Sequence, residues 1–111
     1  MSPKESPYVF RASQAPLVES SATLKVKEAC MLGGMMVRYQ ERSPGSPNTG
    51  PWCKTGHTAY IIAGRLRYEF PDHEVEIAPG DVVHIPAGHA HRHRPHVVGD
   101  ETVKYFITEF T

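Results

Sequence analysis

Imidazole and thiol groups are the side chains of this sequence best suited to binding a metal. Five of the seven histidines fall within thirteen residues, at positions 84, 89, 91, 93 and 96, and the two cysteines are Cys30 and Cys53. Neutral imidazole and thiolate are ligands for zinc, iron, nickel and copper. Two cysteines are too few for a disulfide framework, and a reducing compartment would leave both as thiols. The histidine cluster therefore favours a metal site in this part of the chain.

The segments that would position these residues have the pattern of β-strands. Ten prolines and nine glycines interrupt the chain, which argues against long helices because proline removes a helix donor and glycine raises the entropic cost of ordering. Alternating apolar and polar residues, or runs of β-forming residues, predict strands at 23–28, 31–40, 57–62, 65–70, 74–78, 81–85, 90–96 and 102–110. This spacing indicates an all-β sandwich or barrel.

Turn residues mark the connections between these strands. Residues 63–64 predict a tight turn that joins the strands at 57–62 and 65–70 in a hairpin. Residues 42–51, with the sequence RSPGSPNTGP, predict a loop rather than regular structure.

Length and charge exclude several classes of protein. The 111 residues are enough for one domain, and 12 basic residues balance 12 acidic ones, so no overall field would attract nucleic acid or an anionic membrane. No apolar run approaches the roughly 18 residues of a membrane span, and the polar start of the chain predicts a cytoplasmic protein. We find no Ser-His-Asp order or phosphate-binding glycine loop, so nucleophilic hydrolysis is not supported.

The segment GDVVHIPAGHAH has a specific spacing. From Gly80, Pro86 lies six positions on, Gly88 eight and His91 eleven. This spacing resembles the second motif of the cupin superfamily, G-x5-P-x-G-x2-H-x3-N. Residues 57–64, HTAYIIAG, resemble the end of the first motif, G-x5-H-x-H-x3,4-E-x6-G. The resemblance covers about residues 39–96 and implies a cupin-type double-stranded β-helix, a jelly-roll barrel, over residues 17–111, with residues 1–16 as an extended N-terminal arm.

Several ligand positions of the family carry other residues here. His57 stands where the first motif has Glu, and Cys53 and Pro51 fall on its second and first His, unless a slip of one residue moves Cys53 to the first. Pro95 replaces the Asn of the second motif. Of the four usual ligands His91 alone is retained, so the metal chemistry of the family does not transfer whole.

The resemblance implies one divalent transition metal, Fe, Zn, Ni, Mn or Cu, in the barrel. In a strand over 90–96, alternation would turn His91 and His93 to one face, with His89 at the strand entry, and Arg92 and Arg94 to the other. The candidate ligands are therefore His57, His91, His93, Cys53 and His89. Each also has a purely structural interpretation, for example Cys53 as a small buried apolar residue.

Other residues are candidates for roles around the metal. His84 or Tyr60 would act in proton transfer, although His84 also fits a position that only lines the core or pocket. Trp52 and Tyr39 would form an aromatic wall for a substrate, or pack at the rim of the barrel.

Two functions remain open at this level. The first is a metal-dependent enzyme (oxygenase, isomerase, or lyase or decarboxylase) that acts on a small molecule in the barrel. The second is a non-catalytic cupin module that binds a small molecule or metal as a sensor or as the partner of another protein. We also expect a homodimer, because small open barrels expose strand edges and the arm, with Val9 and Phe10, is suited to crossing to a neighbour.

Overall fold

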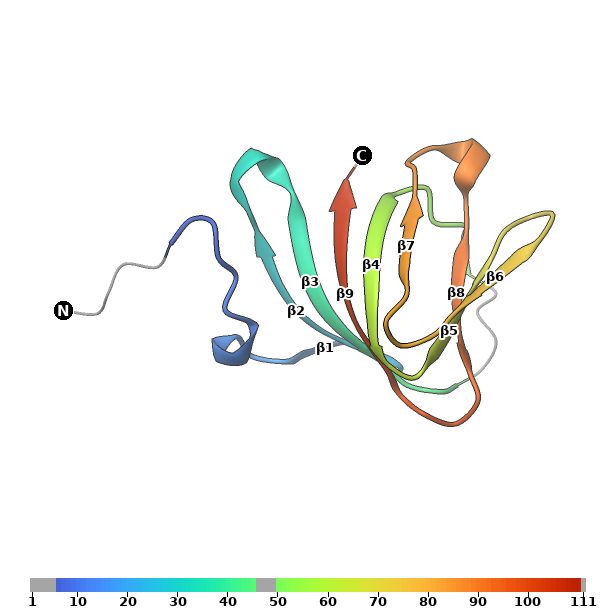
Figure 1. Cartoon of the computed structure of the whole chain (residues 1–111), viewed down its shortest axis with the longest axis horizontal. Coiled ribbons are helices and arrows are strands. Elements are labelled where there is room, and N and C mark those ends of the chain that lie inside the picture. The colour runs from blue at the N-terminus through green and yellow to red at the C-terminus, as the bar shows by residue number, and fades with distance from the viewer. Residues whose placement is uncertain (1–5, 46–49, 111) are drawn as a thin grey trace.

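The structure, a computed structural model, describes residues 6–45 and 50–110. These residues form nine antiparallel strands in two sheets, which make the walls of a jelly-roll barrel (Figure 1). The larger sheet has the order β1 (Val18–Ser21), β2 (Leu24–Cys30), β3 (Met36–Arg42), β9 (Val103–Phe110), β4 (Gly56–Ala63) and β7 (Val82–Ile85). The smaller has the order β6 (Glu74–Ile77), β5 (Arg65–Glu69) and β8 (Arg94–Val98). The predicted all-β jelly-roll barrel is confirmed.

Helical structure in the described ranges is limited to three single-turn 3-10 helices, η1 (Ala12–Gln14), η2 (Leu32–Gly34) and η3 (His89–His91). None of them is long and apolar enough to cross a membrane.

The core lies between the two sheets. Strand alternation turns every second side chain inward, and the buried members include Ile61 of β4, Leu66 and Tyr68 of β5, and Val103 and Tyr105 of β9. Full burial of one such side chain stabilises the fold by roughly 1.5–3 kcal/mol. This packing fixes the inner face of β4. His57, near the start of that face, is therefore held rigidly.

The predicted hairpin of residues 57–62 and 65–70 is wrong. β4 pairs with β7 and β9, whereas β5 pairs with β6 and β8, so the chain changes sheets between them. Gly64 makes the change with a φ of 79°, and a Cβ there would lie 2.8 Å from the Thr102 carbonyl oxygen. Residues 63–64 do connect the two strands by a turn, as predicted, but the strands pack in opposite sheets.

The strand predicted at 31–40 begins later than expected. Gly33 and Gly34 have φ values of 82° and 80°, a conformation that ends extended structure, so η2 takes their place and β3 starts at Met36. From there the alternation is regular, and β3 pairs with β2 and β9 along its whole length. This register decides which side chains of β3 face the interior.

The N-terminal segment lies beside the edge of the larger sheet and extends away from the barrel (Figure 1). Lys27 Nζ donates to the Ala12 carbonyl at 2.9 Å and ties η1 to β2. The sequence does not predict β1, because its residues VESS contain a single apolar side chain. Of the predicted arm, residues 1–5 lie outside the described residues, as do residues 46–49 of the predicted loop.

Candidate metal centre

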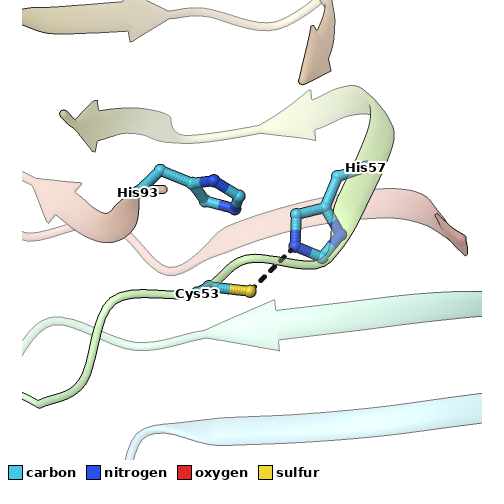
Figure 2. Close-up of side chains that lie close together, drawn as sticks. All are labelled: Cys53, His57 and His93. Atoms are coloured by element: carbon cyan, nitrogen blue, oxygen red, sulfur yellow. Dashed lines mark hydrogen bonds between the residues drawn. The ribbon is translucent and has the colours of Figure 1, made fainter. Parts of the chain in front are cut away.

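Three side chains that can ligate a metal meet inside the barrel. Cys53 lies before β4, His57 is the second residue of β4, and His93 directly precedes β8. The backbones of Cys53 and His93 pair through two N–H to carbonyl hydrogen bonds with N···O distances of 2.8 and 3.0 Å. One ligand atom from each side chain lies within 4.8 Å of the others. Figure 2 shows the thiol and both rings converging on one point.

Core packing holds the two imidazoles. His57 shares the inner face of β4 with Ala59 and Ile61. His93 is 1% exposed, and its ring meets the ring of Tyr68 edge-on, with centroids 5.5 Å apart. The His57 and His93 rings are themselves nearly perpendicular at 5.0 Å. Little rearrangement is therefore open to either ring.

The hydrogen bonding of His93 leaves one nitrogen free toward the cluster. Nδ1 lies 2.9 Å from the His91 carbonyl oxygen, an acceptor, so Nδ1 carries the proton and donates it. Nε2 is then the unprotonated nitrogen, and it is buried without a hydrogen bond to any described residue. A buried acceptor left unpaired costs roughly 1–3 kcal/mol. A metal ion at the cluster would satisfy this lone pair.

The surroundings of the Cys53 thiol favour its ionised form. Its sulfur lies 3.4 Å from His57 Nε2. The hydrogen bond to His57 lowers the pKa of Cys53 most, and the interaction with His93 is the second cause. Together they bring this pKa to about 5, although burial raises it. Burial alone would lower the pKa of His93, but the Cys53 sulfur and the His91 carbonyl raise it overall. The thiolate form, which ligates metals, is thus the form present at neutral pH.

A carboxylate stands behind His57. Glu109 Oε1 lies 3.9 Å from His57 Nδ1, which is buried and has no hydrogen bond to the described residues. Glu109 is fixed by an ion pair with Arg38, whose Nε also donates to Glu28 Oε2 at 2.6 Å. Histidines that bind metals usually direct their second nitrogen to a carboxylate or carbonyl group. Both histidines of the cluster have such a neighbour.

The cluster opens into a cavity of about 230 Å³. Besides the three candidate ligands, its polar lining includes Arg38, Gln40, Arg42, Arg94 and Glu109. Pockets for drug-sized ligands measure roughly 300–1,000 Å³, so this cavity suits a smaller molecule.

Arg94 ties down the segment that carries Cys53. Its Nη2 donates to Glu69 Oε2 at 3.1 Å, its Nη1 donates to the Gly50 carbonyl at 3.1 Å, and its guanidinium stacks 3.9 Å from the centre of the Trp52 ring. The expectation that Arg94 points away from the site is wrong, because it lines the cavity. Arg92 Nη1 instead donates to the His89 carbonyl.

The strand predicted at 90–96 is wrong in its first half. Gly88, with a φ of 118°, leads into η3, so His89 and His91 lie on a 3-10 turn and β8 begins only at Arg94. Both histidines are exposed and neither joins the cluster. Since a 3-10 turn does not alternate as a strand does, His91 and His93 do not share a face, and His93 alone points inward.

The residues expected to act in proton transfer lie on the outer face of β4 and β7. Tyr60 is 49% exposed, on the side of β4 opposite to His57. His84 is also exposed, its Nδ1 lies 2.8 Å from Thr58 Oγ1, and its ring stacks on that of Phe110. The expectation that these two side chains adjoin the metal site is therefore corrected.

The two expected aromatic wall residues are also placed away from the cavity wall. Tyr39 lies on the outer face of β3, donates to Glu41 Oε2 at 2.7 Å and packs on Phe106. Trp52 packs under Arg94 beside the cavity. Neither is among the described residues that line it. Trp52 thus fits the rim-packing alternative, and Tyr39 fits packing on the outer sheet face.

The polar residues on the inner face of β3 and at the end of β9 are not among the candidates that the sequence predicts. Arg38, Gln40 and Arg42 alternate with Val37, Tyr39 and Glu41, a pattern that normally places the charged side outward. Here the charged side faces inward. The available signal was the period of two itself, which already grouped these three side chains on one face.

Two facing antiparallel sheets around a polar cavity, with a Cys-His-His cluster at its wall, define a small jelly-roll barrel with a candidate metal centre. A family model described as a cupin domain matches residues 40–109, and the chain belongs to the cupin family. No curated protein matches the sequence significantly.

Solved structures share the fold at low sequence identity. A protein of unknown function from Rhizobium leguminosarum bv. viciae 3841 is 19% identical with a TM-score of 0.72, over 99% of this chain and 98% of that chain. KdgF from Halomonas sp. is 12% identical with a TM-score of 0.68, over 92% and 91%. An RmlC-like cupin from Shewanella frigidimarina is 12% identical with a TM-score of 0.69, over 95% and 91%. At these identities the likeness concerns the fold alone.

Proposed function

We propose that this cupin binds one divalent transition metal through Cys53, His57 and His93, and that it is an enzyme acting on a small molecule in the adjoining cavity. The observation that carries the proposal is the buried convergence of one sulfur and two ring nitrogens within 4.8 Å, with His93 Nε2 unpaired among the described residues. A site of this composition and burial is costly unless something binds there.

The ligand types narrow the choice of metal. One thiolate and two imidazoles suit zinc, iron, nickel or copper better than manganese, which prefers oxygen ligands. When bound, such a metal supplies a Lewis acid or, for iron and copper, a centre that activates oxygen. A thiolate ligand requires a reduced cysteine, and both Cys30 and Cys53 are free thiols, in keeping with the cytoplasmic location that we propose.

The residues of this chain prepare the site in three ways. The His91 carbonyl keeps the proton of His93 on Nδ1, so Nε2 faces the cluster. Glu109 lies on the far side of His57, where a carboxylate would favour a proton on Nδ1 once a bound metal replaces the Nε2 proton that faces Cys53. The Cys53 thiolate needs no further deprotonation at neutral pH, because its pKa is about 5.

A non-catalytic binding module is the alternative function. Structural zinc sites are closed by four protein ligands, whereas catalytic sites keep a position open for water or substrate. The cluster offers three ligands and faces a cavity, which favours the enzyme. Oxygenation, isomerisation and lyase or decarboxylase chemistry would each use such an open position.

The first prediction is that binding of metal depends on these three side chains. Cys53→Ser, His57→Ala and His93→Ala should each lose most of the zinc or iron that the wild-type protein retains after incubation and desalting, as measured by elemental analysis. His91→Ala is the matched control and should keep the metal, because its side chain is exposed and only its backbone carbonyl contacts His93.

Cobalt substitution adds a direct test of the thiolate. The wild-type protein should show a sulfur-to-metal charge-transfer band that Cys53→Ser lacks. Retention of less than about a tenth of an equivalent of any transition metal at neutral pH would refute the proposed metal site and leave the metal-free binding module as the better function.

A further inference from the structure

The inner face of β3 brings three polar side chains to the cavity. The period of two turns Arg38, Gln40 and Arg42 to the same side, and all three line the cavity that contains the candidate metal centre. A polar side chain inside a barrel is unfavourable unless it has a partner. The charges and donors of these side chains that have no partner among the described residues therefore indicate which kind of ligand this side of the cavity can bind.

The arginines of the cavity differ in their pairing. Arg38 is neutralised by Glu28 and Glu109, and Arg94 by Glu69. Arg42 makes one side-chain hydrogen bond within the described part of the chain, from Nε to the Tyr105 hydroxyl oxygen at 3.2 Å. None of the carboxylates described forms an ion pair with it. Its two Nη groups thus keep their positive charge and their donors for a ligand.

Gln40 is the neighbour of Arg42 on this wall. The residue is 5% exposed and lines the cavity, where no side-chain hydrogen bond of its amide to the described residues is found. The two residues lie two positions apart on one strand, a separation of roughly 7 Å along the backbone. An amide that lines the cavity beside a guanidinium fork is a second donor available to an acceptor bound there.

We propose that Arg42 and Gln40 bind the carboxylate of a small carboxylic acid, which is the substrate class of this cavity. The assignment rests on the proposed function, since it concerns the same cavity. A carboxylate is flat, carries one negative charge and accepts two parallel hydrogen bonds, which matches one uncompensated guanidinium. A phosphate dianion concentrates two negative charges on one group, which is more than Arg42 alone compensates, whereas each carboxylate of a dicarboxylic acid carries one. The volume of about 230 Å³ favours an acid smaller than a typical drug-sized ligand.

Malonate, its neutral analogue malonamide and inorganic phosphate are the probes for this site. Calorimetric titration is done first on protein freed of metal by chelation, so that binding through a metal does not contribute, and then on zinc-loaded protein. We expect malonate to bind wild-type protein in both states and malonamide not to bind. Arg42→Gln should weaken malonate binding at least tenfold, and Gln40→Met several-fold.

The control is Arg65→Gln, which removes an exposed arginine paired with Glu76 outside the cavity. It should leave malonate affinity unchanged. Circular dichroism checks the fold of Arg42→Gln, because Tyr105 loses a hydrogen bond there. If that variant does not fold, the malonate affinities of Gln40→Met and wild type decide whether this site binds a carboxylate.

The possible outcomes separate the two proposals. Equal malonate affinity in wild type, Arg42→Gln and Gln40→Met, or equal binding of malonamide, overturns the carboxylate assignment whatever the metal content. Tighter binding of phosphate than of malonate, lost in Arg42→Gln, also overturns it. Malonate binding that depends on Arg42 in a protein that takes up no zinc, iron, nickel or copper overturns the proposed metal function and supports the carboxylate site.

Discussion

At the scale of single residues, Cys53 combines two properties that are usually separate. It is partly buried, which by itself raises the pKa of a thiol, yet two imidazoles beside it favour the thiolate more strongly. The same arrangement serves metal binding, since a ligand that is already ionised needs to lose no proton. The metal-free protein therefore holds a thiolate next to an imidazole N–H, and a bound metal would replace that proton.

This state predicts an acid midpoint for Cys53. The pKa of Cys53 falls from its ordinary value of 9.0 to about 5 on folding. The thiolate therefore stabilises the fold fully above about pH 9, and this contribution is lost progressively as the pH falls from 9 through 5. Thiolate absorbance at 240 nm in metal-free Cys30→Ser protein should titrate near pH 5.

Two variants test which neighbours lower the pKa of Cys53. His57→Ala should raise the midpoint markedly, because the hydrogen bond to His57 contributes most to the lowered pKa. His91→Ala should leave it in place. A midpoint near pH 8 in metal-free Cys30→Ser protein with His57 intact would contradict the geometry of the cluster.

At the scale of elements, core strands could be predicted from the sequence and the histidine segment could not. Alternation in Leu66 and Tyr68 or in Val103 and Tyr105 gives both the strand and its buried face, because burial imposes the period of two. The segment after Gly88 follows a positive φ and a 3-10 turn, which periodicity does not encode. Of the candidate ligands, His57, Cys53 and His93 come together, whereas the motif position His91 does not.

The change of sheets at Gly64 gives a prediction about stability. Gly64→Ala combines an unfavourable φ with a Cβ 2.8 Å from the Thr102 carbonyl oxygen and 2.9 Å from Val103 Cα, and both neighbours are backbone atoms that cannot move aside easily. Gly99→Ala has a similar φ of 83° and open space. We expect a loss of about 1 kcal/mol for Gly99→Ala and more than about 2 kcal/mol for Gly64→Ala, measured by urea unfolding. Equal losses would show that the close approach to β9 contributes nothing.

At the scale of the whole molecule, the outer face of the larger sheet carries an apolar row. The register aligns Tyr39, Phe106, Tyr60 and Val82 across β3, β9, β4 and β7, and the last three are 39%, 49% and 64% exposed. Exposed apolar groups of this kind often mark contacts between molecules. The homodimer that the sequence predicts would cover this row with a second copy, and it stays a prediction.

The candidate metal centre lies where the two sheets of the barrel approach each other. His57 belongs to the larger sheet, His93 adjoins β8 of the smaller one, and Cys53 lies in the connection from β3 to β4, where its backbone pairs with that of His93. Each ligand comes from a different segment, so the complete set exists only in the folded chain. A metal bound there would cross-link both walls of the barrel, and its binding free energy would add to the free energy of unfolding.

Zinc should therefore raise the thermal stability of the protein. At a free zinc concentration 100 times the Kd, the free energy of unfolding should rise by about 2.7 kcal/mol, which for a domain near 100 residues is a rise in Tm of roughly 10–20 °C. Scanning calorimetry with and without a chelator measures this. His57→Ala should melt at the same temperature in both conditions, whereas His91→Ala should respond as the wild type does, because its ring lies on the surface outside the cluster. A rise of equal size in His57→Ala and wild type would place the bound zinc elsewhere, since the link between the two sheets requires that imidazole.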